Sequence, residues 1–119
     1  MLFRSDAELG AARGTHDFAG FAASSDPREK TERTMTATRV SRDAMTFALD
    51  IEGDGFLQHM VRILVGTVVD VALGRMPAGT IAHVLAAKDR RLAGQTAPPD
   101  GLYLEDVVLR PLPEGERWP

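Results

Sequence analysis

A long apolar helix in the middle of the chain constrains the fold more than any other feature. Residues 56–73 repeat apolar side chains at the spacing of a helix, about 100° per residue. The side chains on one broad face are Leu57, Met60, Val61, Leu64, Val65, Val68, Val71 and Ala72. Such a face packs against other elements in a folded protein. We therefore predict that it forms part of the core.

The opposite side of this helix carries a single cation. His59, Arg62 and Gly66 gather there, between Ile63 and Val69, without the Lys and Glu of a solvated face. We expect Arg62 to be half-buried, and a buried guanidinium needs an anionic partner. Gly66 would allow another backbone or a ligand to approach closely. Two interpretations stay open: Arg62 grips a carboxylate or phosphate in a cleft, or it belongs to a structural ion pair.

Composition indicates one folded domain with a modest core. The 119 residues are 44% hydrophobic and 26% charged. The absence of cysteine excludes a disulfide framework and a thiolate metal site. No apolar run reaches the roughly 18 residues of a membrane span, and no signal peptide is visible. We therefore expect a cytoplasmic protein that does not bind membranes.

The net charge of −3 argues against a general nucleic-acid binder, but the charges are unevenly distributed. Residues 28–42 hold five basic side chains, and Lys88, Arg90 and Arg91 form a second basic cluster. Each cluster could simply be solvated surface. Together they also suit a partner that is anionic and selective.

Turn and capping residues divide the chain into short elements. We predict a helix at 5–13, an anchored turn at 16–21, a loop at 22–32, strands at 33–41 and 45–52, the long helix, a helix at 77–88, a loop at 94–100 and a strand at 102–109. Ser5 and Glu8 have the spacing of a capping box. Because strands and helices are segregated, the predicted class is α+β, with a mainly antiparallel sheet and helices packed on one face. Its open edges suggest that the chain is part of something larger.

The residues alone do not locate a catalytic site. His16, His59 and His83 lack metal-ligand spacing, so no metal is expected. The acidic segment 50–55 fails as a calcium loop because Val61 stands where a bidentate Glu is required. No motif singles out a serine nucleophile.

Nine short motifs in a fixed order are more informative. They are His16-Asp17-Phe18, Arg33-Thr34, Gly55-Phe56-Leu57, His59-Met60-Val61-Arg62, Val65-Gly66-Thr67, Asp89-Arg90, Ala93-Gly94, Thr96-Ala97-Pro98-Pro99 and Gly101-Leu102-Tyr103-Leu104. Over residues 7–111 they closely resemble the C-terminal half of the TruA-type tRNA pseudouridine synthases. The resemblance implies half of a two-lobed fold, with residues 6–112 as the C-terminal domain and 113–119 as a tail.

The resemblance also implies a reaction and its site. These homodimeric enzymes isomerise uridine to pseudouridine in the tRNA anticodon stem-loop without a cofactor. An aspartate acts on the sugar, and Arg62 matches the arginine that keeps this aspartate ionised. Leu102 matches an apolar residue that lies against the target uracil, although it could be an ordinary core residue of a strand. We expect His59 and Arg33 to contact the substrate as well.

Several departures from the family pattern limit this expectation. The aspartate belongs to an Arg-Thr-Asp-x-Gly motif of the missing N-terminal half, and Arg33-Thr34-Met35 does not replace it. Ile63 stands where an Asn is common, and the loop before Arg33 lacks the usual Pro. We therefore predict that the isolated chain is inactive. The alternative is a non-catalytic RNA-binding or interaction module.

The first residues have a sequence that suggests a non-native origin. Leu2-Phe3-Arg4-Ser5 is what the end of a common sequencing adapter encodes. Residues 1–5 are therefore expected to be a non-native leader on a truncated reading frame.

Overall fold

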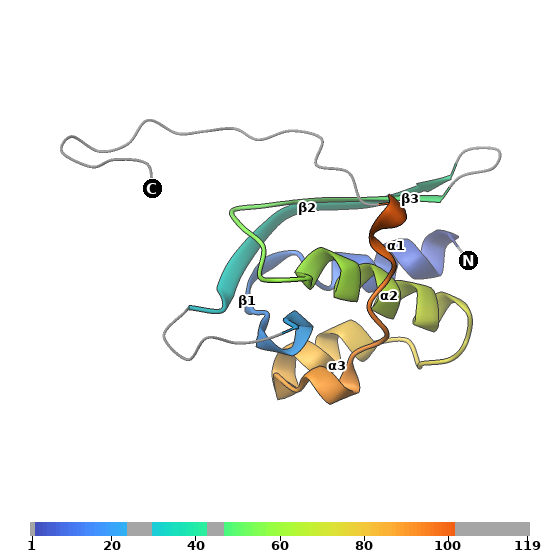
Figure 1. The fold of residues 1–119 in the computed structure, drawn as a ribbon. Helices are drawn as coiled ribbons and strands as arrows, with labels where there is room; N and C mark the ends of the chain where they lie inside the picture. Colours follow the sequence, from blue (N-terminus) through green and yellow to red (C-terminus); the bar gives the residue numbers. More distant parts are fainter. Residues whose placement is uncertain (1, 24–29, 43–46, 102–119) are drawn as a thin grey trace.

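The computed structural model describes residues 2–23, 30–42 and 47–101 of the chain (Figure 1). The elements in order are α1 (Leu2–Gly10), β1 (Gly14–Asp17), the 3-10 helix η1 (Ala19–Phe21), β2 (Glu32–Arg42), β3 (Phe47–Gly53), α2 (Met60–Ala72), α3 (Thr80–Ala87), and the 3-10 helices η2 (Arg90–Leu92) and η3 (Pro99–Gly101). Strand β2 lies between β1 and β3 in an antiparallel sheet, and the α-helices pack on one face of it. The predicted α+β class is confirmed.

The core lies between the sheet and the helices. Its largest fully buried apolar side chains are Phe18, Phe21, Leu9, Met35, Met60, Ile63, Leu64, Ile81, Val68, Val71 and Val84. Of the eight side chains on the predicted core face, four are in this set, Leu57 is buried outside it, and Val61, Val65 and Ala72 are half-buried. The fully buried side chains also include Phe18 and Phe21 of the segment 16–21. They also include Ile63, which we had expected beside the cation face. Burial of this set supplies the main stabilising free energy of the fold.

Helix α2 is shorter than the predicted segment 56–73. It begins at Met60, and His59 before it has a left-handed backbone with φ of 61°. Leu57 is buried in the core, while the carbonyl of Gln58 accepts a hydrogen bond from the N–H of Ala23 at 3.1 Å. These tertiary contacts hold residues 56–59 out of the helix despite their apolar spacing.

Helix α1 also differs from its prediction. It spans Leu2–Gly10 instead of 5–13, so Ser5 lies buried within it and does not cap it. Glu8 does not complete a capping box either. Its carboxylate accepts hydrogen bonds from the N–H groups of Gly79 and Ile81, both at 2.8 Å. A negative charge there stabilises the first turn of α3, whose N–H groups lack helical partners.

The paired strands 33–41 and 45–52 are confirmed as β2 and β3, but their facing pattern is not regular. A bulge between Met35 and Ala37 shifts the register against β3. As a result Met35, Thr38 and Val40 are all buried, while Ala37 is exposed. A regular strand would place Met35 and Ala37 on the same face, but the bulge reverses the side-chain faces beyond it.

Parts of the prediction lie outside the described residues. These are the strand at 102–109, with Leu102, and the beginning of the predicted strand at 45–52. Within the described residues β1 supplies the third strand instead. The first helix includes residues 2–5, and the proposed leader and domain boundaries stay predictions. None of the helices in the described part of the chain is long and apolar enough to cross a membrane.

Asp17 connects β1 to two neighbouring segments. Its carboxylate accepts hydrogen bonds from the Thr31 hydroxyl at 2.6 Å and the Ala19 N–H at 3.0 Å, and the ammonium of Lys88 lies 3.7 Å away. The Thr31 bond above all holds the pKa of Asp17 below its ordinary value. A lowered pKa stabilises the fold above the pKa of the unfolded chain, and this stabilisation is lost as pH falls through the folded-state pKa.

We expect Asp17→Asn to lower the free energy of unfolding near neutral pH by about 1–3 kcal/mol, because hydrogen bonds to a charged acceptor are lost. The difference from the unchanged chain should shrink as the pH falls below about 4, where the carboxylate is protonated first in the unfolded chain, and vanish below the folded-state pKa. Urea unfolding at neutral pH and near the carboxyl pKa measures both effects. An equal difference under both conditions would contradict this account of Asp17.

Candidate active site around Arg62

Arg62 lies in the first turn of α2 and is half-buried, as predicted. Its Nε atom donates a hydrogen bond to the carbonyl oxygen of Ala97 at 2.8 Å. The N–H of Ala97 in turn donates to the carbonyl oxygen of Arg62 at 3.0 Å. Residue 97 therefore fixes both the backbone and the side chain of Arg62.

Ala97 ends a segment, residues 93–97, that crosses over α2 and is called the strap below. It follows η2 and leads toward η3 on the sheet side of the molecule (Figure 1). The crossing occurs at Gly66, where a Cβ atom would overlap the carbonyl oxygen of Gln95. The predicted close approach of another backbone at Gly66 is thus confirmed. On the strap, Gly94 also approaches α2 closely: a Cβ there would lie 2.7 Å from the Cα atom of Thr67.

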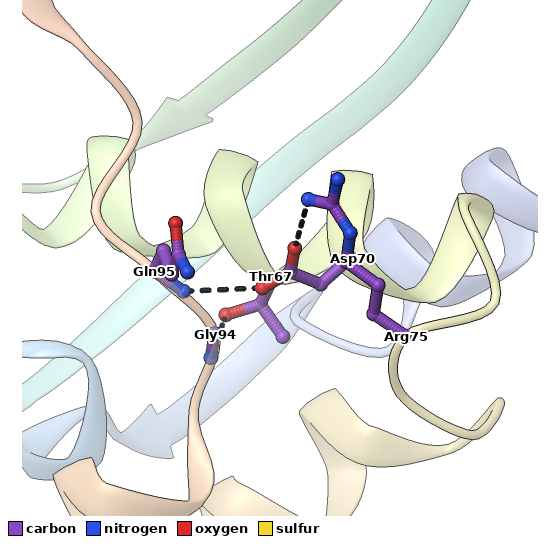
Figure 2. Close-up of polar contacts among 5 residues, drawn as sticks. All are labelled: Thr67, Asp70, Arg75, Gly94 and Gln95. Atoms are coloured by element: carbon purple, nitrogen blue, oxygen red, sulfur yellow. Dashed lines mark hydrogen bonds and ion pairs between the residues drawn. The ribbon is translucent and has the colours of Figure 1, made fainter.

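Two polar side chains of α2, Thr67 and Asp70, accept hydrogen bonds from the strap (Figure 2). The hydroxyl of Thr67 accepts a hydrogen bond from the N–H of Gly94 at 2.9 Å. The Oδ2 atom of Asp70 accepts one from the N–H of Gln95 at 3.2 Å, while its Oδ1 atom pairs with Arg75 at 3.4 Å. Both α2 side chains are buried, and the bond from Gly94 to Thr67 is shielded from water, whereas the bond from Gln95 to Asp70 is partly buried.

A third side chain holds the strap from η2. Arg90 donates from Nη1 to the carbonyl oxygen of Gly94 at 3.0 Å and from Nη2 to the hydroxyl of Thr96 at 3.2 Å. The strap is therefore fixed at residues 94, 95, 96 and 97 in succession. Its path, and with it the position of the Ala97 carbonyl, is set by several independent contacts.

The anion expected beside Arg62 is not found in the part of the chain that the structure describes. No carboxylate there lies within ion-pairing distance of Arg62, and its two Nη atoms make no hydrogen bond to the described residues. The structural ion pair, one of the two interpretations, is thus not formed within residues 2–23, 30–42 and 47–101. Within the described residues, the guanidinium is thus fixed at Nε, and neither Nη atom has a partner there, so both could bind an anion from elsewhere.

The other predicted site residues are only partly placed. His59 is exposed and immediately precedes α2, three residues before Arg62. Arg33 is half-buried on β2, where Nη1 donates to the carbonyl oxygens of Lys30 and Glu32, and its Nε would lie 3.3 Å from a Cβ at Gly55. Leu102 is outside the described residues. The roles of all three in binding substrate stay predictions.

Sequence reasoning missed the residues that hold the strap. Thr67 and Asp70 are polar residues three apart on a helix whose only other polar side chain is Arg62, and that spacing was the available signal. Their partners at Gly94 and Gln95 are more than twenty positions away in the chain, so the contact could not be inferred from a local pattern.

Comparison with known proteins agrees with the motif pattern. A family profile described as tRNA pseudouridine synthase matches residues 11–108. The tRNA pseudouridine synthase A of Geobacillus kaustophilus is 47% identical over 91 residues, which cover 76% of this chain and 35% of the relative. That of Chloroflexus aurantiacus is 44% identical over 109 residues, 88% of this chain and 39% of the relative. That of Acetivibrio thermocellus is 42% identical over 94 residues, which cover 79% of this chain and 38% of the relative.

The matched region covers far more than half of the chain, so the chain belongs to the tRNA pseudouridine synthase family. It spans less than two fifths of the length of these curated relatives.

Proposed function

We propose that this chain is the C-terminal part of a tRNA pseudouridine synthase that isomerises uridine in the anticodon stem-loop. In this proposal Arg62 pairs with a catalytic aspartate carried by the rest of the enzyme. The observation that supports it best is the half-buried Arg62, whose Nε is fixed by Ala97 while both Nη atoms lack a partner among the described residues. Family membership supplies the reaction class.

The chemistry explains why a fixed guanidinium would be needed. The bond from C1′ of the ribose to N1 of uracil breaks, the base turns, and a bond from C1′ to C5 forms. The C5 hydrogen leaves as a proton, and N1 gains one. An aspartate that attacks or deprotonates the sugar must stay ionised and oriented, and a planar guanidinium can hold a carboxylate through two parallel hydrogen bonds. No cofactor enters this scheme.

The remaining parts of the proposal concern partners. The target base would leave the stack and enter a cleft shared with the missing half. His59, Arg33 and Leu102 would contact the substrate there, and the enzyme would act as a homodimer. Exposed cations on and before β2, such as Lys30, Arg39 and Arg42, would contact phosphates of the tRNA.

A chimera tests the proposal directly. This chain replaces the matched segment of the Geobacillus kaustophilus enzyme, and activity is measured as tritium release from tRNA labelled at C5 of uridine. We expect the chimera to release tritium and the isolated 119-residue chain to release none, because it lacks the Arg-Thr-Asp-x-Gly aspartate.

Two results would contradict the proposal. Tritium release by the isolated chain would mean that an aspartate of this chain performs the chemistry. A folded chimera that binds tRNA without releasing tritium, beside an active parent enzyme, would favour the non-catalytic RNA-binding module.

A further inference from the structure

We propose that Thr67 is a positioning residue of this enzyme, acting on the reaction through the strap and Arg62. The inference rests on the proposed function, because it assumes that Arg62 aligns the catalytic aspartate. It adds a residue that touches neither substrate nor the reacting atoms. Its hydroxyl would fix the strap, and the strap would fix the direction in which the guanidinium points.

The hydroxyl of Thr67 makes two hydrogen bonds, one within α2 and one to the strap. Thr67 is fully buried, and its Oγ1 atom donates to the carbonyl oxygen of Ile63 at 2.8 Å while accepting from the N–H of Gly94 at 2.9 Å. The first bond orients the hydroxyl, so its lone pair faces the strap. Removing the oxygen would leave the Gly94 N–H buried without its partner, which is costly.

The strap transmits this position over three residues to Ala97. There, one residue both accepts from the Nε atom of Arg62 and donates to its carbonyl oxygen. Nε, Cζ and the two Nη atoms of a guanidinium are coplanar. A hydrogen bond at Nε therefore restrains the orientation of the group, and with it the directions in which both Nη atoms can point. A strap shifted at Gly94 would turn or release that plane.

Two side chains besides Thr67 hold the strap. Loss of the Thr67 hydroxyl should therefore loosen the strap without detaching it. Asp70 still binds Gln95, and Arg90 still binds Gly94 and Thr96. We therefore expect a partial loss of alignment. Small misplacements of a catalytic group reduce the rate of the chemical step, and they do not require weaker substrate binding.

Three variants of the chimera separate positioning from general stability. Thr67→Val removes the hydroxyl at nearly constant volume, and Thr67→Ser keeps it. Thr80→Val is the matched control, because Thr80 is also a buried helical threonine whose hydroxyl donates to a carbonyl oxygen, that of Pro77 at 2.6 Å. Thr80 makes no contact with the strap among the hydrogen bonds of the described residues.

We expect Thr67→Val to lower kcat about 10- to 100-fold at an unchanged KM for tRNA, since alignment is lost and RNA contacts are not. Thr67→Ser should restore most of the rate, and Thr80→Val should leave kcat near the parent value. In an Arg62→Ala background, Thr67→Val should cause no further loss, because the group that the strap positions is already gone.

Other outcomes have distinct meanings. If Arg62→Ala keeps the full rate, the site assignment of the proposed function fails. If Arg62→Ala is slow but Thr67→Val is fast, only the inference about Thr67 is overturned. It is also overturned if Thr67→Val raises KM alone, or slows the Arg62→Ala enzyme by the same factor.

A second variant keeps the test decisive if Thr67→Val does not fold. Arg90→Met removes two strap bonds from a half-buried side chain while keeping an unbranched apolar stem. We expect a smaller fall in kcat with the same lack of effect in the Arg62→Ala background. A full rate for Arg90→Met would then overturn the inference.

Discussion

Arg62→Ala in the chimera is expected to lower the rate of uridine isomerisation about a hundredfold or more, comparable to removing one preorganised electrostatic partner. The reason is geometric. Ala97 fixes the guanidinium at Nε, and both Nη atoms are left for an anion from outside the described residues. The affinity for tRNA should change little, because RNA binding is spread over many phosphate contacts. Single-turnover kinetics and a separate binding titration measure the two quantities.

Arg62→Lys sharpens this prediction. Lysine keeps the charge but lacks the planar guanidinium and the Nε–H group that donates to the Ala97 carbonyl oxygen. We therefore expect the lysine variant to be slow as well. Lys30→Ala is the matched control for a lost cation, since Lys30 is exposed before β2. It should weaken binding and reduce its salt dependence while leaving the single-turnover rate intact. An Arg62→Ala enzyme with the pattern of the Lys30 control would identify Arg62 as a phosphate contact.

Local patterns were enough to predict the half-burial of Arg62 and the close approach at Gly66. The half-burial of Arg62 follows from a cation on a helix face without other charges, and the close approach at Gly66 follows from a glycine one turn further. Both depend only on residues of one helix. The pairing of β2 with β3 was likewise predictable from two neighbouring runs of alternating side chains, the first of them rich in β-branched residues.

Long-range contacts account for what the sequence could not predict. The start of α2 is set by the burial of Leu57 and by a bond from Ala23 to Gln58, neither of which alters the helical spacing. Glu8 accepts hydrogen bonds from N–H groups at the start of α3, more than seventy residues away, although its spacing from Ser5 had indicated a local cap. The strap is the same case. Thr67 is recognisable as polar, but its partner depends on the path of residues 93–97.

Gly66→Ala should strongly reduce both stability and rate, although two physical effects on stability oppose each other. Helix propensity alone predicts that alanine in the interior of α2 stabilises the fold by about 1 kcal/mol. The strap predicts the opposite, because the new Cβ would overlap the Gln95 carbonyl, and backbone cannot rotate away as a flexible side chain can. We expect the steric effect to win, with a loss of about 1–3 kcal/mol in the free energy of unfolding.

The same substitution should also slow the chimera, because a displaced strap no longer presents the Ala97 carbonyl to Arg62. A fall of about a hundredfold in kcat is expected from such a misplacement. Val69→Ala is the matched control, since Val69 is exposed on the same helix and its replacement by alanine leaves the strap in place. Urea unfolding and single-turnover rates of both variants decide between the effects. A Gly66→Ala chimera that is more stable and fully active would mean that the strap does not hold Arg62 in the working enzyme.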